Sequence, residues 1–240
     1  MQIIRKFMSK AEDNYGAAPV TLAFLGDSVT QGCFEIYTKS DGNIETVYDK
    51  NNAYHAHLAQ MLAVLYPSVP VNIINAGISG DNAPHGFERL ERDVISHAPD
   101  LAVVCFGLND CGAGKDGLEK YVRALEGIFS ALQSAGIETL FMTPNMMCTH
   151  ISCHLKEENH IACAASCAQR QNDGTLDLYM DAARKAAQQY GIPICDCYAK
   201  WKRLSECGVD VTELLSNKIN HPTREMNRLF AVSLLETMFA

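Results

Sequence analysis

The sequence has no apolar run long enough to cross a bilayer. The longest, Leu101–Leu108, is interrupted by Gly107 and is far shorter than the roughly 20 residues that a transmembrane helix needs. The N-terminal stretch MQIIRKFMSKAED also lacks the apolar core and the small-residue cleavage site of a secretory signal peptide. We therefore expect the protein to be cytoplasmic and not to bind a membrane.

The sequence also has fewer basic than acidic residues. The 240 residues include 20 Lys and Arg against 28 Asp and Glu, which gives a formal net charge of −8. This balance provides no basic surface for nucleic acid, so we expect no nucleic-acid partner. Apolar residues make up 48% of the chain and charged residues 20%, which is typical of a soluble globular protein. The oligomeric state stays open.

Several motifs of well-known enzyme classes are missing. The chain has no P-loop, and NAGISGD at 75–81 does not satisfy the dinucleotide-binding fingerprint. Ser28 is followed by Val29 and Thr30, so it does not stand in the Gly-x-Ser-x-Gly elbow of the α/β-hydrolases. These absences argue against nucleotide enzymes and against that one class of serine hydrolase.

No two cysteines form a Cys-x-x-Cys pair, although the chain has 10 of them. The segment 148–167 combines cysteines with histidines, which are the ligands that zinc prefers, but their spacing fits no standard zinc finger. We therefore predict reduced thiols, no metal and no other cofactor. A zinc site in this segment is the alternative that stays open, and a helical lid over a substrate would suit the same place.

Five short apolar runs indicate strands that are buried on both faces of a parallel sheet, because the runs are nearly continuous rather than alternating. They lie at Val20–Leu25, Val71–Asn75, Leu101–Phe106, Thr139–Thr143 and Ile192–Cys197.

Helical patterns separate these runs, at 53–66, 86–97, 118–136, 173–191 and 225–239. Alternating strands and helices predict a three-layer α/β sandwich, with a five-stranded parallel sheet flanked by helices and joined by right-handed crossovers. No linker or repeat interrupts the pattern, so we expect a single domain over residues 1–240.

Polar and glycine-rich blocks follow the predicted strands at the edge where open α/β sheets bind their ligands. Gly26-Asp27-Ser28 follows the first strand, NAGISGD the second, GLND the third and TPN the fourth, and NHPT precedes the last helix. Together they supply a hydroxyl, backbone amides beside glycines, a side-chain amide and an imidazole. Acyl transfer needs this set: a nucleophile, a base and donors for an oxyanion.

Each block also has a purely structural interpretation. Gly-Asp-Ser is a common turn, and Gly77 and Gly80 are suited to a tight bend. Asn109 is a good helix cap, and His221-Pro222 is a usual way to enter a helix. The order of the blocks at successive strand ends favours the functional interpretation.

The same blocks resemble the SGNH hydrolases, also called GDSL esterases or lipases, from about Val20 to the C-terminus. The resemblance implies that Ser28 is the nucleophile and His221 the general base. It also implies an oxyanion hole made of the backbone N–H groups of Ser28 and Gly80 and the side chain of Asn109. The fold of that family is flavodoxin-like, a five-stranded parallel sheet between helices, which agrees with the strand count above.

One departure from the family pattern concerns the aspartate that usually stands three residues before the histidine. Lys218 occupies that position, and an ammonium group cannot accept a hydrogen bond from the ring of His221. Three interpretations remain open: a Ser–His dyad oriented by a backbone carbonyl, a carboxylate from Asp196 or Glu213, or a carbohydrate- or acyl-binding module without activity. We favour the dyad, because a carbonyl can select the ring tautomer.

The resemblance predicts a serine esterase that hydrolyses carboxylic esters through an acyl-Ser28 intermediate. The family acts on lipid esters, thioesters and acetylated sugars. The absence of a long apolar lid favours a short-acyl or acetyl ester, on a small molecule or a carbohydrate. We expect Phe34, Glu35, the insertion between Thr38 and Asn51, and Asn145 after Pro144 to shape the substrate pocket.

Overall fold

A five-stranded parallel sheet runs through the centre of the computed structural model, which describes all 240 residues. The strand order is β4-β1-β5-β6-β7, and every pairing is parallel. The strands are β1 Val20–Gly26, β4 Val71–Gly77, β5 Leu101–Cys105, β6 Glu138–Thr143 and β7 Ile194–Asp196. The five predicted strands are therefore confirmed, with shifts only at their ends.

Burial along the strands explains why the sequence pattern was continuous. Every residue of β5 is buried, and so are all but one residue of β1 and of β6, because these strands lie inside the sheet with helices on both faces. The edge strand β4 is half-exposed and places Asn72 and Asn75 toward solvent. Polar side chains on an edge strand discourage pairing with a second sheet.

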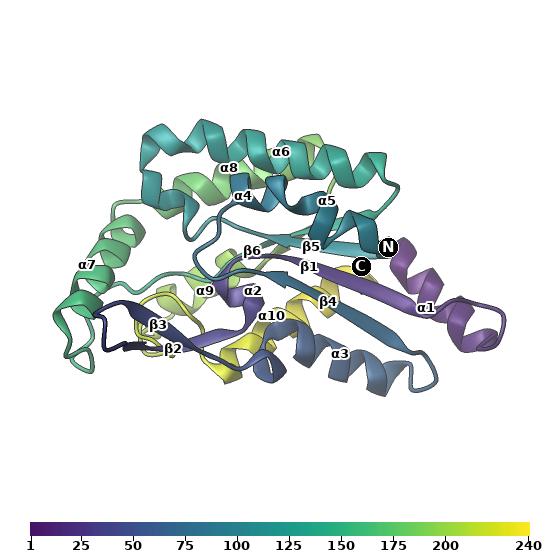
Figure 1. Cartoon of the computed structure of the whole chain (residues 1–240), viewed down its shortest axis with the longest axis horizontal. Coiled ribbons are helices and arrows are strands. Elements are labelled where there is room, and N and C mark those ends of the chain that lie inside the picture. The colour runs from purple at the N-terminus through teal and green to yellow at the C-terminus, as the bar shows by residue number, and fades with distance from the viewer.

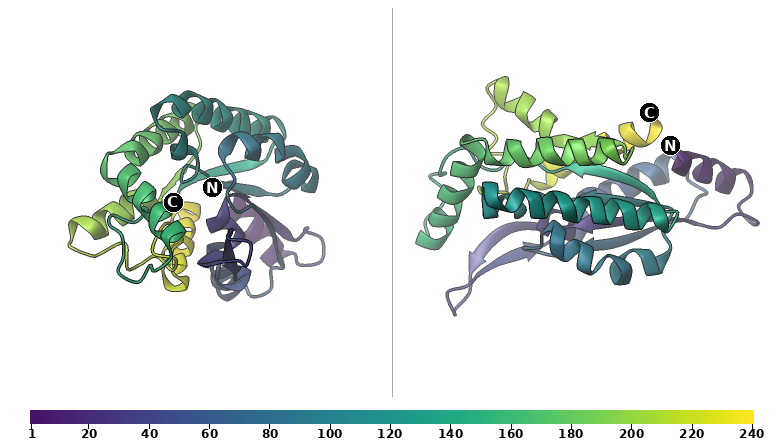
Figure 2. Two further views of the ribbon diagram at one scale, coloured as in Figure 1. Left: turned by 60° about the vertical axis from the view of Figure 1, so that its left-hand side comes forward. Right: turned by 90° about the horizontal axis from the view of Figure 1, so that it is seen from above.

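Helices cover both faces of the sheet, so the predicted three-layer sandwich is confirmed (Figure 1). On one face lie α4, α5, α6 and α8, of which α6 and α8 run side by side (Figure 2). On the other face lie α3 and α10, with α9 next to α10. The bounds are α1 Gln2–Glu12, α3 Tyr54–Leu65, α4 Ala83–Glu88, α5 Leu90–Asp93, α6 Leu118–Ser134, α8 Thr175–Gln189, α9 Cys197–Glu206 and α10 Arg224–Phe239. None of the helices has the length and apolar character that crossing a bilayer requires.

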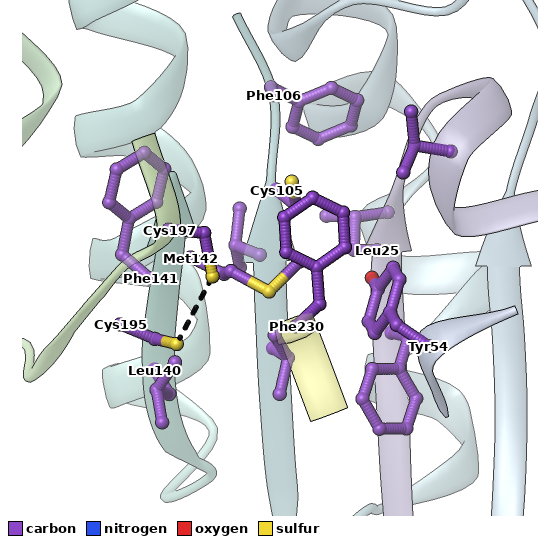
Figure 3. Close-up of a cluster of buried hydrophobic side chains, with 14 of the residues drawn as sticks. Leu25, Tyr54, Cys105, Phe106, Leu140, Phe141, Met142, Cys195, Cys197 and Phe230 are labelled. Atoms are coloured by element: carbon purple, nitrogen blue, oxygen red, sulfur yellow. Dashed lines mark hydrogen bonds between the residues drawn. The ribbon is translucent and has the colours of Figure 1, made fainter. Parts of the chain in front are cut away.

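The core fills both interfaces between sheet and helices. Side chains alternate along β6, so Phe141 packs edge-on against Phe129 of α6, with ring centroids 5.8 Å apart. On the opposite face, Tyr54 of α3 and Phe230 of α10 meet with ring centroids 5.9 Å apart (Figure 3). Buried cysteines fill gaps among these rings as small apolar side chains, and all 10 cysteines are free.

The helix expected over 86–97 is broken into α4, α5 and a 3-10 turn, Ile95–His97. The break falls at Arg89, whose buried guanidinium donates hydrogen bonds to the carbonyls of Gly26 and Ala76. These carbonyls lie at the ends of β1 and β4, so Arg89 turns inward to tie the two strands together. The helical spacing of apolar residues contains no sign of this inward turn.

A hairpin that was not predicted lies beyond the carboxyl ends of the sheet strands, together with a helix that overlaps the segment 148–167, where a helical lid was considered (Figure 1). The antiparallel hairpin is formed by β2 Cys33–Thr38 and β3 Ile44–Tyr48, and α7 Glu158–Asn172 lies near it. Asp41-Gly42-Asn43 at the hairpin turn is a recognisable sequence signal, since Gly42 adopts a φ of 83°. The remaining short elements are α2 Ser28–Gln31 and the 3-10 turns Lys50–Asn52, Asp110–Ala113 and Lys115–Gly117.

Candidate active site

Ser28 begins α2 directly after the carboxyl end of β1. A Cβ on Gly26 would lie 2.8 Å from the carbonyl oxygen of Cys105, so a side chain there would push β1 and β5 apart. Asp27 caps α2 by accepting a hydrogen bond from the backbone N–H of Val29 at 3.0 Å. This tight turn holds the Ser28 hydroxyl at the edge of the sheet.

His221 lies in the loop between α9 and α10, and one asparagine shapes that loop. The side-chain oxygen of Asn217 accepts hydrogen bonds from the backbone N–H groups of Ile219, Asn220 and His221 at 2.9–3.0 Å. Asn145, after β6, donates from its Nδ2 to the Asn220 carbonyl at 2.8 Å. The loop is thus anchored to the sheet, and the imidazole faces α2.

The two ring nitrogens of His221 have different partners. Nε2 lies 3.0 Å from the Oγ of Ser28, and Nδ1 lies 2.9 Å from the backbone carbonyl oxygen of Phe34. A carbonyl only accepts hydrogen bonds, so Nδ1 carries the proton and donates it to Phe34. Nε2 is then the acceptor for the Ser28 hydroxyl, which is the tautomer that a general base requires.

The imidazole of His221 is buried, and burial lowers its pKa from 6.5 to about 4. The hydrogen bond to the Phe34 carbonyl and the negative charge of Glu35 act in the opposite direction, but burial is the larger effect. The ring is therefore neutral near pH 7 and able to accept a proton.

Gly80 and Asn109 come from the ends of β4 and β5, and both line the same cavity as Ser28 and His221. Gly80 has a φ of 78°, and its backbone N–H has no acceptor within the protein. The Nδ2 of Asn109 donates to the carbonyl of Asp81 at 2.8 Å, which leaves the second N–H of this amide free. Four predicted site residues thus meet at one cavity.

Three buried carboxylates stabilise the loops that carry Ser28, Gly80 and Asn109. Asp81 forms an ion pair of 2.7 Å with Arg89, and Asp110 accepts a hydrogen bond from the backbone N–H of Ala83 at 2.9 Å. Burial raises the pKa of Asp27 to about 7 and that of Asp110 to about 6. The carboxylates of Asp27, Asp81 and Asp110 make no hydrogen bond to the His221 ring, so they contribute to the structure of the loops.

The cavity around Ser28 has a volume of about 310 Å³. Its outer wall comes from the hairpin and from α7, through Ile36, Ile44, Glu45, Thr46 and Cys163. Three of these residues lie in the insertion between residues 38 and 51 that the sequence singled out. The individual side chains were missed because the hairpin had not been recognised, although its turn residues were a usable signal.

The other residues predicted for the substrate pocket lie elsewhere, which corrects that prediction. Phe34 is buried, and it is its backbone carbonyl that contacts His221. Glu35 pairs with Arg224 and lines a neighbouring cavity of about 360 Å³. Asn145 is fully buried and bonded to backbone carbonyls. All three therefore lie outside the lining of the Ser28 cavity.

Neither candidate for a third carboxylate contacts His221. Asp196 is paired with Arg184 at 2.9 Å and also caps α9, which occupies both of its oxygens. Glu213 is paired with Lys218 at 2.9 Å. The carboxylate alternatives therefore lack the required geometry, and the backbone carbonyl expected in the dyad interpretation occupies the position beside Nδ1.

The cysteine- and histidine-rich segment 148–167 does not converge on one point. From this segment only His150 belongs to a group able to hold a metal, together with Asp210 and Glu213, whose ligand atoms lie within 4.8 Å of one another. All three side chains are exposed, and Glu213 already forms its ion pair with Lys218. This group lacks the Cys and His donor set that made zinc an alternative.

Comparisons with known proteins agree with this geometry at the level of the fold. A two-domain esterase (CEX) active on acetylated mannans has a similar structure, with a TM-score of 0.69 and 19% identity over 99% of this chain and 52% of that one. The acetyl xylan esterase AlAXEase gives a TM-score of 0.66 and 20% identity over 90% of this chain and 98% of that one. Both share the α/β sandwich described above.

Sequence similarity gives the family. An acetylxylan esterase from Geobacillus stearothermophilus is 32% identical over 89 residues, which are 37% of this chain and 39% of that protein. The chain thus matches well under two thirds of this curated relative. The family model described as GDSL-like Lipase/Acylhydrolase matches residues 24–229, a range that includes all four residues at the cavity. The chain therefore belongs to the GDSL-like lipase/acylhydrolase family.

Proposed function

We propose that this protein is a serine esterase that removes acetyl groups from carbohydrates. The observation that carries the proposal is the hydrogen-bonded pair of Ser28 Oγ and His221 Nε2 at 3.0 Å, with Nδ1 held by a carbonyl. Such a pair activates a hydroxyl that is otherwise a weak nucleophile. A binding module without activity would not need this tautomer.

In the first half-reaction the Oγ of Ser28 attacks the acetyl carbonyl carbon, and Nε2 of His221 takes the hydroxyl proton. The negative charge that develops on the carbonyl oxygen is stabilised by the backbone N–H groups of Ser28 and Gly80 and by Asn109 Nδ2. When the intermediate collapses, the carbon–oxygen bond to the sugar breaks and His221 gives its proton to the sugar oxygen. The acetyl group remains on Ser28.

In the second half-reaction a water molecule attacks the acetyl-Ser28 carbonyl, and His221 Nε2 takes a proton from that water. The same three donors stabilise the second oxyanion. Collapse returns the proton from His221 to Ser28 Oγ and releases acetate. The Phe34 carbonyl accepts the Nδ1–H bond throughout, so the ring keeps one orientation in both steps.

Two observations support an acetylated carbohydrate as the substrate. The relatives named above are esterases of acetylated xylan and acetylated mannan. In addition, four of the 13 residues that line the Ser28 cavity are hydrophobic, which suits a short acyl group on a polar alcohol better than a long acyl chain.

The proposal is tested by acetate release from acetylated xylooligosaccharides and mannooligosaccharides, with p-nitrophenyl acetate and p-nitrophenyl palmitate as reference esters. We expect release from the acetylated substrates and little turnover of palmitate. A fluorophosphonate probe followed by peptide mass spectrometry should place the label on Ser28. A folded protein that releases no acetate and takes up no probe would contradict the proposal and favour a binding role.

Asn109→Ala should lower kcat for acetyl-ester hydrolysis by roughly 10²–10³, with little change in KM, because one donor to the oxyanion is lost. Steady-state kinetics separates the two constants. A change confined to KM would mean that Asn109 binds the ground state of the substrate instead. Since Asn109 also bonds the Asp81 carbonyl, thermal melting of the variant serves as the control for folding.

The pH dependence should reflect the low pKa of His221. The neutral ring is the active form, so kcat/KM for an uncharged acetyl ester should stay high well below pH 6.5 and fall as the pH approaches about 4. In the unfolded chain the ring takes its proton near pH 6.5, so acidification from pH 6.5 to 4 also lowers the free energy of unfolding. Circular dichroism at each pH separates the two effects. An acid limb centred near pH 6.5 in folded protein would contradict the expectation.

A further inference from the structure

Arg224, at the start of α10, makes three kinds of contact with β2 and with the residue that follows β3. Its two terminal nitrogens donate to the two carboxylate oxygens of Glu35, at 2.6 and 3.1 Å. Its Nε donates to a carboxylate oxygen of Asp49 at 2.8 Å. The guanidinium carbon also lies 4.3 Å from the ring centroid of Phe34, within the range of a cation–π contact. A planar, bidentate group of this kind restrains both position and orientation.

Arg224 contacts Phe34 and Glu35, and these are the residues of β2 that pair least regularly with β3. The pairing register between β2 and β3 shifts between Cys33 and Ile36, which are the residues on either side of Phe34 and Glu35. Residues at such an irregularity lack a continuous ladder of hydrogen bonds. Within the hairpin, the Oγ1 of Thr46 donates to the Glu35 carbonyl at 3.1 Å. From outside it, Arg224 contacts both the Phe34 ring and the Glu35 side chain.

We propose that Arg224 is a positioning residue, which fixes the Phe34 carbonyl against Nδ1 of His221 and neutralises Glu35 beside the ring. The Phe34 carbonyl is the acceptor that orients the imidazole. The position of this carbonyl therefore decides which tautomer forms and whether Nε2 faces the hydroxyl of Ser28. Arg224 hydrogen-bonds neither to Ser28 nor to the His221 ring, and its contacts are with β2 and with Asp49 after β3. The catalytic consequence rests on the proposed function, whereas the effect on the ring does not.

The electrostatic part of this inference concerns the charged groups around His221. Glu35 on β2 is the charged group that acts on the pKa of the ring, and it raises that pKa. Glu45 on β3 and Cys163 on α7 face the same cavity, and Lys218 in the His221 loop is turned to Glu213.

The hydrogen bonds from Arg224 hold the pKa of Glu35 below its usual range, so Glu35 is ionised but paired. Removing Arg224 therefore exposes the ring to an unpaired negative charge, and removing Glu35 takes that charge away.

Histidine side-chain NMR of ¹⁵N-labelled protein tests the proposal without any substrate. The signal that His221→Ala removes identifies the ring, and its nitrogen shifts report both tautomer and pKa. In the parent we expect the Nδ1–H tautomer. Arg224→Gln should mix the tautomers, because the Phe34 carbonyl is no longer held against Nδ1. Glu35→Gln should lower the pKa of His221 and should disturb the tautomer less, because the contact of Arg224 with the Phe34 ring remains. If Arg224 acted only through its ion pair with Glu35, the tautomer would change equally in both variants.

Arg184→Gln is the matched control. Arg184 also forms a bidentate pair with a carboxylate, Asp196, and lies over an aromatic ring, that of Tyr198. Its side chain is 23% exposed, against 32% for Arg224, and none of its hydrogen bonds reaches the site residues. We expect the His221 signal of this variant to match that of the parent.

Kinetics provides the second readout. Arg224→Gln should lower kcat by about 10- to 100-fold with a small change in KM, because the base is misaligned while the cavity is kept. Arg224→Lys should recover part of the loss, since one of the contacts to Glu35 can still form.

If the His221 signal in Arg224→Gln equals that in Arg184→Gln, the positioning proposal is wrong, whatever the activity. If the signal changes as expected but the parent releases no acetate, the positioning proposal stands and the proposed function fails.

Discussion

Replacing Ser28 with alanine should lower kcat for acetyl-ester hydrolysis by about 10⁵- to 10⁶-fold, the loss typical of removing a catalytic serine. This corresponds to about 7–8 kcal/mol in the activation free energy. The effect is large because no other hydroxyl is hydrogen-bonded to the His221 ring, so nothing replaces the attacking oxygen. Acetate release, followed at saturating substrate with a high enzyme concentration, measures the residual rate.

Ser79→Ala provides a matched control, because Ser79 is a second serine on the wall of the same cavity. Its removal should change kcat by less than about tenfold, since its hydroxyl is not paired with a base. Alanine at position 28 can adopt the same backbone conformation as serine, so both variants should have melting temperatures close to that of the parent. A folded Ser28→Ala protein that keeps more than about 1% of the parent kcat would rule out the serine mechanism.

Replacing His221 with alanine should lower kcat about as much as the Ser28 change, because nucleophile and base act as one unit. By contrast, Asp196→Asn and Glu213→Gln should each stay within about tenfold of the parent, a change below roughly 1.4 kcal/mol. An aspartate that orients a catalytic histidine usually matters by about 10⁴ when it is changed to its amide. The contrast separates a dyad oriented by a carbonyl from a triad.

The two carboxylate variants also differ in what they do to the fold. Asp196 pairs with Arg184 and caps α9, so its amide should lower the melting temperature somewhat. Glu213 is an exposed partner of Lys218, so its amide should leave the melting temperature nearly unchanged. A thousandfold loss of kcat in either variant, with a normal circular dichroism spectrum, would make that residue the third member of a triad.

Much of the sheet could be predicted because its strands are buried on both faces, and burial leaves continuous apolar runs such as Leu101–Phe106 in the sequence. The blocks after these runs were equally visible. Chain direction alone brings the ends of parallel strands to one edge, so Ser28, Gly80 and Asn109 could be expected to meet there. What was missed was local: the break at Arg89 depends on carbonyls that are distant in the sequence.

The sequence by itself determined the layer architecture, the family and the four residues at the cavity, because each leaves a pattern of residue types. Only the tertiary structure decided what orients His221. Its partner is the main-chain carbonyl of Phe34, 187 positions away, and a carbonyl is present in every residue, so no residue type marks it. Phe34 and Glu35 were misjudged as pocket residues because both side chains contact Arg224 instead. The register shift of β2 against β3 interrupts the regular alternation of side chains at these two residues, and that register exists only in the folded chain.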